Sequence, residues 1–257
     1  MKKILLFILT ATLFSCQKND YYAFSFAGRS IDLVDSLEQG DDAFANMLNT
    51  ENYISISSDT AERYFSAISE GQHFIRITGE ISKDFIAGIS KIMRDKPEPE
   101  IYLDLSKTTG LIYCPNADSG FNNVNCLVGI ITPESLQAIG NFTFSNCKKL
   151  KYVILNDGLQ FIGSLAFAKT TAPKINNAIK SVNIPSSVTW IGIGAFQGVI
   201  RSAIELTSSD RWYYTNDYAN FITKKGGEKI EQLTTKNLTI GISIDDTYYY
   251  KYYFYKK

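Results

Sequence analysis

Residues 127–144 read Leu127-Val-Gly-Ile-Ile-Thr-Pro-Glu-Ser-Leu-Gln-Ala-Ile-Gly-Asn-Phe-Thr-Phe144, and the same order of apolar positions returns at residues 150–167 and 179–196. Phe121, Phe144 and Phe167 are 23 residues apart, and Phe196 follows after 29. A repeat of this period is typical of architectures in which one unit is too small to bury its own apolar edge. Each unit must therefore stack on its neighbours.

Each unit has the same local pattern. It opens with L-x-x-L-x-L, whose alternating second half is typical of a strand with one buried face. A turn follows, then a second short apolar piece that ends in Ile-Gly, and then a turn that carries the phenylalanine. The six extra residues of the last unit fall within residues 169–178, a polar stretch with Pro173 that favours a surface loop. We predict about four coils of 23 residues over residues 111–205.

The pattern of residues 61–110 predicts a cap at the N-terminal end of the coils. Residues 73–78 alternate as a strand, Ser82 is placed to cap a helix with one apolar face, and residues 101–105 alternate as a second strand. Strand, helix and strand over about thirty residues form a βαβ unit with parallel strands. Such a unit is suited to cover the first open edge of the stack.

The pattern of residues 206–257 predicts a C-terminal β cap. Residues 238–244 alternate strictly between apolar and polar, Asp245-Asp246 supplies a turn, and residues 247–255 carry six tyrosines. We predict a terminal hairpin beside the last coil. The tyrosines either cover a strand edge or form an adhesive, self-associating surface.

Two segments carry a family resemblance. They are Ser135-Leu-Gln-Ala-Ile-Gly-Asn-Phe-Thr-Phe-Ser-Asn-Cys147 and Ile184-Pro-Ser-Ser-Val-Thr-Trp-Ile-Gly-Ile-Gly-Ala-Phe196. Both resemble the BspA-like leucine-rich repeats of bacterial surface proteins, and the resemblance covers roughly residues 73–205. Together with the caps predicted above, it gives an α/β fold: a leucine-rich-repeat solenoid with a βαβ-like N-terminal cap and a C-terminal β-hairpin cap. It also implies adhesion or binding to host extracellular proteins or to other cells.

The first fifteen residues have the features of a secretion signal. Lys2 and Lys3 precede an eleven-residue apolar run, which is too short to span a bilayer. The sequence Leu13-Phe-Ser-Cys16 resembles the lipobox of bacterial lipoproteins, in which the cysteine becomes the acylated N-terminus. An ordinary secretory signal with a chance cysteine is the alternative. Acylation of Cys16 predicts a lipid-anchored segment over residues 16–60 and a place in the cell envelope, on the outer membrane facing the exterior.

Composition excludes several classes of function. The 257 residues include 26 basic and 26 acidic side chains, and loss of residues 1–15 leaves 24 against 26, a net charge of −2. This balance argues against a nucleic-acid partner, because such affinity comes from clustered Lys and Arg. His73 is the one histidine and no C-x-x-C pair occurs, which removes most catalytic and zinc constellations. We expect no catalytic residue, metal or cofactor, and we expect Cys114, Cys126 and Cys147 to be core residues.

A ligand surface is the better expectation. Phe161 and Trp190 occupy one position in successive units, where Ala138 precedes them, and outward rings there would form an aromatic strip for a sugar face or an apolar anchor. The alternative is that the Trp212-Tyr213-Tyr214 segment folds back over them. Tyr152 falls between buried strand positions, on an open sheet face. The candidate ligand surface comprises Tyr152, Phe161, Trp190, Trp212 and Tyr213.

These observations predict a non-catalytic, lipid-anchored cell-surface protein with leucine-rich repeats that recognises or adheres to an extracellular protein or glycan. The membrane, reached through the lipid anchor, is its other partner. An alternative of another class is an accessory glycan-handling protein or enzyme subunit of the cell envelope that uses surface carboxylates. A third possibility is a structural component that assembles through Tyr248 to Tyr255.

Overall fold

The computed structural model describes residues 23–26, 29–32, 42–168, 179–199, 204–206, 212–230, 242–244, 247–249 and 253–256. The chain divides into two compact units, Met1–Asp42 and Ala43–Lys257. In the first unit, β1 (Ala23–Phe26) and β2 (Arg29–Asp32) form an antiparallel pair. The predicted signal segment, Cys16 and the insertion at residues 169–178 lie outside the described residues.

The second unit has mixed α/β content and, within the described residues, two seven-stranded sheets. The strands of the first sheet are all parallel, and in spatial order they are β13 (Ile204–Leu206), β11 (Ser181–Ile184), β9 (Tyr152–Ile154), β7 (Leu127–Ile131), β5 (Glu100–Thr109), β4 (Gln72–Glu80) and β3 (Ile54–Ser57). The second sheet runs β15 (Glu228–Ile230), β14 (Trp212–Thr215), β18 (Tyr253–Lys256), β12 (Trp190–Ile191), β10 (Phe161–Ile162), β8 (Ala138–Ile139) and β6 (Tyr113–Cys114).

The helical elements are short. They are α2 (Asp42–Leu48), α3 (Ser58–Ala67), α4 (Lys83–Arg94) and α5 (Tyr218–Thr223), with 3-10 turns η1 (Thr50–Asn52) and η2 (Ala117–Ser119). Two further strands, β16 (Ile242–Ile244) and β17 (Thr247–Tyr249), pair antiparallel with each other.

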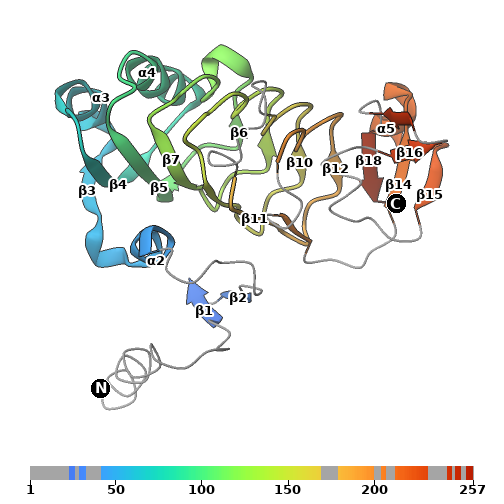
Figure 1. Cartoon of the computed structure of the whole chain (residues 1–257), viewed down its shortest axis with the longest axis horizontal. Helices are drawn as coiled ribbons and strands as arrows, with labels where there is room; N and C mark the ends of the chain where they lie inside the picture. The colour runs from blue at the N-terminus through green and yellow to red at the C-terminus, as the bar shows by residue number, and fades with distance from the viewer. Residues whose placement is uncertain are drawn as a thin grey trace. The chain divides into compact units, whose positions relative to one another are not determined.

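The repeats alternate between the two sheets (Figure 1). Each repeat gives its longer strand to the first sheet and its two-residue strand to the second, so that β7, β9 and β11 are followed by β8, β10 and β12. The register aligns the predicted positions: Ile130 pairs with Val153, and Ile139 pairs with Ile162. All four side chains are buried. The repeat alignment read from the sequence is therefore confirmed in these strands.

A column of phenylalanine rings runs through the core between the sheets. Phe121, Phe144, Phe167 and Phe196 stack at centroid distances of 5.3, 5.2 and 5.3 Å, with interplanar angles of 9° or less. All four rings are at most 2% exposed. The step from Phe167 to Phe196 is as short as the others although six extra residues lie between them. The column thus keeps one spacing across repeats of different length.

A glycine in each repeat allows this close stacking. A Cβ atom on Gly163 would lie 2.5 Å from the carbonyl oxygen of Gly140 and 2.6 Å from the amide nitrogen of Asn141. Real Cβ atoms do not approach backbone atoms so closely. Gly163 is therefore required because the backbone of the preceding repeat occupies the space of a side chain.

The N-terminal part of the first sheet is a βαβαβ run. The predicted strand–helix–strand unit is β4, α4 and β5, and Ser82 caps α4 by accepting a 3.2 Å hydrogen bond from the amide of Phe85. A further strand, β3, and helix, α3, precede it, so the boundary predicted at residue 61 falls inside α3. The reason is that β3 has only four residues, three of them exposed, and such a strand gives a weak apolar pattern.

The C-terminal part corrects the expectation of a hairpin beside the last coil. The hairpin exists as β16 and β17, but the strand that pairs with β12 is β18, which follows it. Tyr255 of β18 lies opposite Trp190 in antiparallel register, and the amide of Lys256 donates to the carbonyl of Thr189 at 2.9 Å. Phe254 and Tyr255 are both buried, so β18 extends the second sheet and its apolar core.

Removal of one ring from the phenylalanine column should be costly. Phe144→Ala deletes a buried ring between two stacked neighbours, and we expect it to lower the free energy of unfolding by about 3–5 kcal/mol. Phe142→Ala is the matched control, because Phe142 is in the same repeat and 40% exposed. We expect the control to cost less than about 1 kcal/mol in urea unfolding. Equal losses in the two variants would contradict a structural role for the column.

Candidate ligand-binding site

The second sheet carries a row of aromatic side chains on one face. In the parallel register, Tyr113 of β6 pairs with Ala138 of β8, Ala138 pairs with Phe161 of β10, and Phe161 pairs with Trp190 of β12. Partners in a parallel register point to the same face of a sheet. The row is therefore aromatic at every strand except β8, where Ala138 leaves space between the rings on either side.

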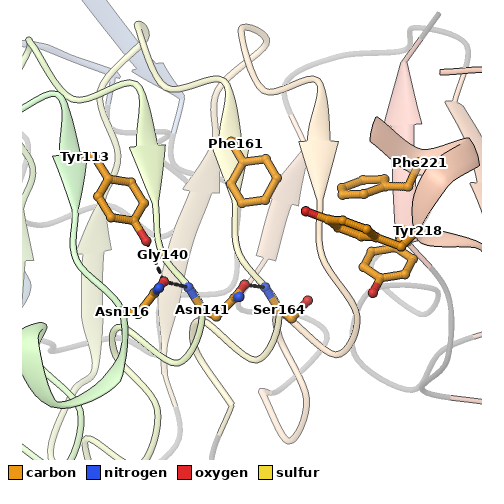
Figure 2. Close-up of a pocket in the computed structure, with 9 residues that line it drawn as sticks. Tyr113, Asn116, Gly140, Asn141, Phe161, Ser164, Tyr218 and Phe221 are labelled. Atoms are coloured by element: carbon orange, nitrogen blue, oxygen red, sulfur yellow. Dashed lines mark hydrogen bonds between the residues drawn. The ribbon is translucent and has the colours of Figure 1, made fainter. Parts of the chain in front are cut away.

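A pocket of about 310 Å³ lies along this row (Figure 2). Its walls come from β6, β10 and β18, from the turns that follow β6, β8 and β10, and from α5. The lining residues are Tyr113, Asn116, Gly140, Asn141, Phe161, Ser164, Tyr218, Phe221 and Tyr253. Aromatic rings and uncharged polar groups thus share one cavity.

Two asparagine side chains form a ladder along one side of the pocket. The Oδ1 atom of Asn116 accepts from the backbone amide of Asn141 at 2.7 Å and from the Tyr113 hydroxyl at 2.5 Å. The Oδ1 atom of Asn141 accepts from the backbone amide of Ser164 at 2.8 Å. A backbone N–H can only donate, so the oxygen of each side-chain amide must face it. The two NH₂ groups are left without an acceptor among the described residues.

Helix α5 closes the pocket at the C-terminal end of the row (Figure 2). Asp217 caps the helix by accepting from the amide of Ala219 at 2.7 Å. Phe221 is fully buried, stacks on Tyr253 at 4.5 Å and lies 6.2 Å from the Phe161 ring. This contact attaches α5 to the repeats.

Trp190 fixes the position of α5. Its indole Nε1 donates to the carbonyl of Phe221 at 3.3 Å, and the Lys224 ammonium lies 3.7 Å from the centre of its ring. Desolvation, followed by the charge of Lys256, lowers the pKa of Lys224. The ammonium is therefore drawn partly out of water by its contact with the tryptophan. Trp190 positions the wall of the pocket and does not line it.

None of the described residues that line the pocket carries a charged side chain. Burial, and then the neighbouring Cys114 thiol, raises the pKa of Tyr113; burial, and then Tyr218, raises that of Tyr253. Both phenols are protonated at neutral pH, since an ordinary tyrosine already has a pKa of about 10. The site offers hydroxyl and amide groups with aromatic faces, and it offers no general base or nucleophile with a lowered pKa.

A family model for the BspA type leucine rich repeat region matches the chain in six copies, over residues 117–198 and 172–254. Together these ranges cover more than half of the chain. The chain belongs to the BspA-type leucine-rich repeat family. Comparison with curated proteins and with solved structures returned no match. A BspA-type repeat region is generally a recognition domain rather than a catalytic one.

The structure of this BspA-type chain separates the predicted ligand residues. Phe161 lines the pocket, and Trp190 is half-buried beneath α5. Tyr152 and Trp212 are 1% and 2% exposed, so neither belongs to a ligand surface. Tyr213 is half-buried and stacks on Tyr255 at 5.6 Å, away from the pocket.

These corrections have physical causes. The outer face of the first sheet is covered around Tyr152. The Tyr152 ring lies next to that of Tyr102, with ring centroids 6.4 Å apart. The side chains of Tyr102 and of Met47 from α2 both lie over Gly129. The predicted fold-back does occur over Trp190, but it is made by α5 instead of residues 212–214.

Most of the pocket was missed because it lies outside the aromatic pattern. Successive repeats carry a polar residue just after the two-residue strand, namely Asn116, Asn141 and Ser164. This row of polar residues could have indicated the pocket from the sequence. Tyr113 was missed because its repeat is two residues longer, which hides its match to Ala138. The residues of α5 and β18 belong to no repeat, and no periodicity points to them.

Two further sets of polar side chains lie outside the pocket. Arg76 and the fully buried Asp104 form an ion pair at 2.7 Å, and the other Asp104 oxygen accepts from the amide of Ser106 at 2.8 Å. The three described cysteines are buried thiols, as expected for core residues, and burial raises the pKa of Cys114 and of Cys126 to about 12. The described part of the chain holds no cluster of three or more potential metal ligands, and it has no helix long and apolar enough to cross a membrane.

Loss of the Trp190 ring should loosen α5. Trp190→Ala removes a hydrogen bond and a cation–π contact, and we expect amide hydrogen exchange in residues 218–223 to accelerate about 5–30-fold. Trp190→Phe keeps a ring under Lys224 and should show a smaller increase. Exchange in α4 serves as the internal reference and should not change. Unaltered exchange in α5 of the alanine variant would contradict the positioning role.

Proposed function

We propose that this chain is a lipid-anchored, non-catalytic recognition protein of the bacterial cell envelope, displayed on the outer membrane and facing the exterior. Its ligand is an extracellular protein or glycan. Membership of the BspA-type repeat family is the observation that carries the proposal. The lipobox-like Leu13-Phe-Ser-Cys16 supports the anchor.

The proposed architecture is a leucine-rich-repeat solenoid with a cap at each end. A stack of repeats has open apolar edges at its first and last units, and these edges need cover. The run from β3 to β5 is suited to cover the first edge, because its strands continue the first sheet and two helices supply additional core. Strands β18, β14 and β15 are suited to cover the last edge, because they continue the second sheet in antiparallel pairing.

The anchor follows from simple energetics. Each methylene group of an acyl chain that enters a membrane contributes about 0.8 kcal/mol, so one chain binds weakly and two or more bind firmly. An acylated Cys16 would hold the repeats at the membrane without a transmembrane helix. In the sequence, Cys16 precedes Tyr113, the first residue of the pocket, by 97 positions.

Cys16→Ser tests the anchor in the full chain. We expect the wild-type protein, made in a bacterial host with an outer membrane, to partition into the detergent phase and to be cleaved by protease added to intact cells. Cys16→Ser should move to the aqueous phase, because no acyl chain can be attached. Ser15→Ala keeps the cysteine and is the matched control. Detergent-phase partition of Cys16→Ser would overturn the lipid anchor.

Adhesion of the same cells tests recognition. Cells that display the wild-type chain should adhere to at least one immobilised matrix protein or glycan more strongly than cells with an empty vector. Display without any gain in adhesion would overturn the recognition function.

A further inference from the structure

We propose that the pocket between Tyr113 and Phe161 binds one neutral sugar residue of a glycan. This inference rests on the recognition function proposed above and names the ligand class of its site. Four features carry it: the gap at Ala138, the oriented amide groups, the absence of charge, and the position of the pocket on a sheet face.

The gap has the dimensions of a ring-shaped ligand. Tyr113 and Phe161 stand on β6 and β10, two strand spacings apart, which is about 10 Å. Ala138 on the strand between them is too small to fill this space. The whole pocket, which extends from Tyr113 past Phe161 to α5, has a volume of about 310 Å³, at the small end of the range of about 300–1,000 Å³ for ligand pockets. The aromatic faces offer an apolar contact for the C–H face of a sugar.

The amide ladder supplies oriented hydrogen-bond donors. The NH₂ groups of Asn116 and Asn141 are fixed in direction because their oxygen atoms are held by backbone amides at 2.7 and 2.8 Å. They stand one repeat apart, about 4.8 Å, so both can donate to oxygen atoms of a single sugar ring. Ser164 also lines the pocket, and its hydroxyl can both donate and accept. Groups that are already ordered lose little entropy when they bind.

The lining selects against other ligand classes. A phosphate or a carboxylate calls for Lys or Arg, and neither is among the described residues that line the pocket. Peptides are usually recognised at a sheet edge, in a long apolar groove or along an uninterrupted row of aromatic residues, and here Ala138 interrupts the row. This pocket lies on the face of a sheet and is closed at one end by α5. A short, neutral ligand rich in hydroxyl groups fits these features best.

The test uses the full chain, purified in a zwitterionic detergent because alkyl-glycoside detergents carry sugar. The probes are a glycan array followed by cellotetraose, mannotetraose, N-acetylchitotetraose and lacto-N-tetraose at millimolar concentration, with saturation-transfer NMR as the readout. Sialyllactose is the charged probe, and decaproline is the peptide probe. We expect binding to at least one neutral saccharide.

Three variants examine the three parts of the pocket. Phe161→Ala removes a ring, and Ala138→Trp fills the gap without removing any donor. Asn141→Asp keeps the oxygen that accepts from the Ser164 amide and replaces only the NH₂ group. Each should weaken binding of the neutral saccharide about tenfold or more. Phe142→Ala removes an exposed aromatic ring outside the lining and should leave binding unchanged.

The outcomes separate this inference from the proposed function. Saccharide binding that is lost in the three variants, with unfolding midpoints preserved in Asn141→Asp, supports the sugar site. No saccharide binding, retained binding in all three variants, or binding of decaproline or sialyllactose alone overturns it. If Asn141→Asp keeps its saccharide binding and cells that display it still adhere as the wild type does, the recognition function stands and the pocket assignment fails. If displayed wild-type protein gives no adhesion, the proposed function itself fails.

Discussion

The close approach of successive repeats at the glycine that ends each short strand is the constraint on which the rest of the structure depends. At Gly163 the neighbouring backbone stands where a Cβ atom would be, and the register of the second sheet follows from that contact. The same spacing sets the 5.2–5.3 Å steps of the phenylalanine column. Burial of these rings contributes hydrophobic stabilisation that a single repeat could not achieve alone.

The pocket is a consequence of this register. Equivalent side chains of successive repeats lie in a row on the face of the sheet. A smaller residue in one repeat therefore leaves a gap in that row, and a larger residue projects from it. Ala138 creates the gap, and the asparagines of two repeats align because each accepts from the backbone of the next. A site of this kind needs no departure from the repeat geometry, only a change in side chains at positions that do not support the core.

Sequence reasoning was strongest where periodicity encodes structure. The repeat register, the Ser82 cap and the parallel β4–α4–β5 unit all follow from apolar spacing and local capping chemistry, and the structure confirms them. The sequence did not predict contacts between elements that are far apart in the chain. No local pattern shows that β18 pairs with β12 or that Tyr152 is covered. Phe161 was found because it repeats, whereas Phe221 was not, because α5 reaches the pocket through tertiary contacts alone.

If the glycine contact sets the register of the repeats, Gly163→Ala should disturb it. The backbone of Gly163 is not in the left-handed region, so alanine adds one methyl group and no conformational strain of its own. The account predicts that this methyl group, forced against the backbone of Gly140 and Asn141, lowers the free energy of unfolding in urea by about 1–3 kcal/mol or more. An unfolding free energy equal to that of the wild type would contradict the account.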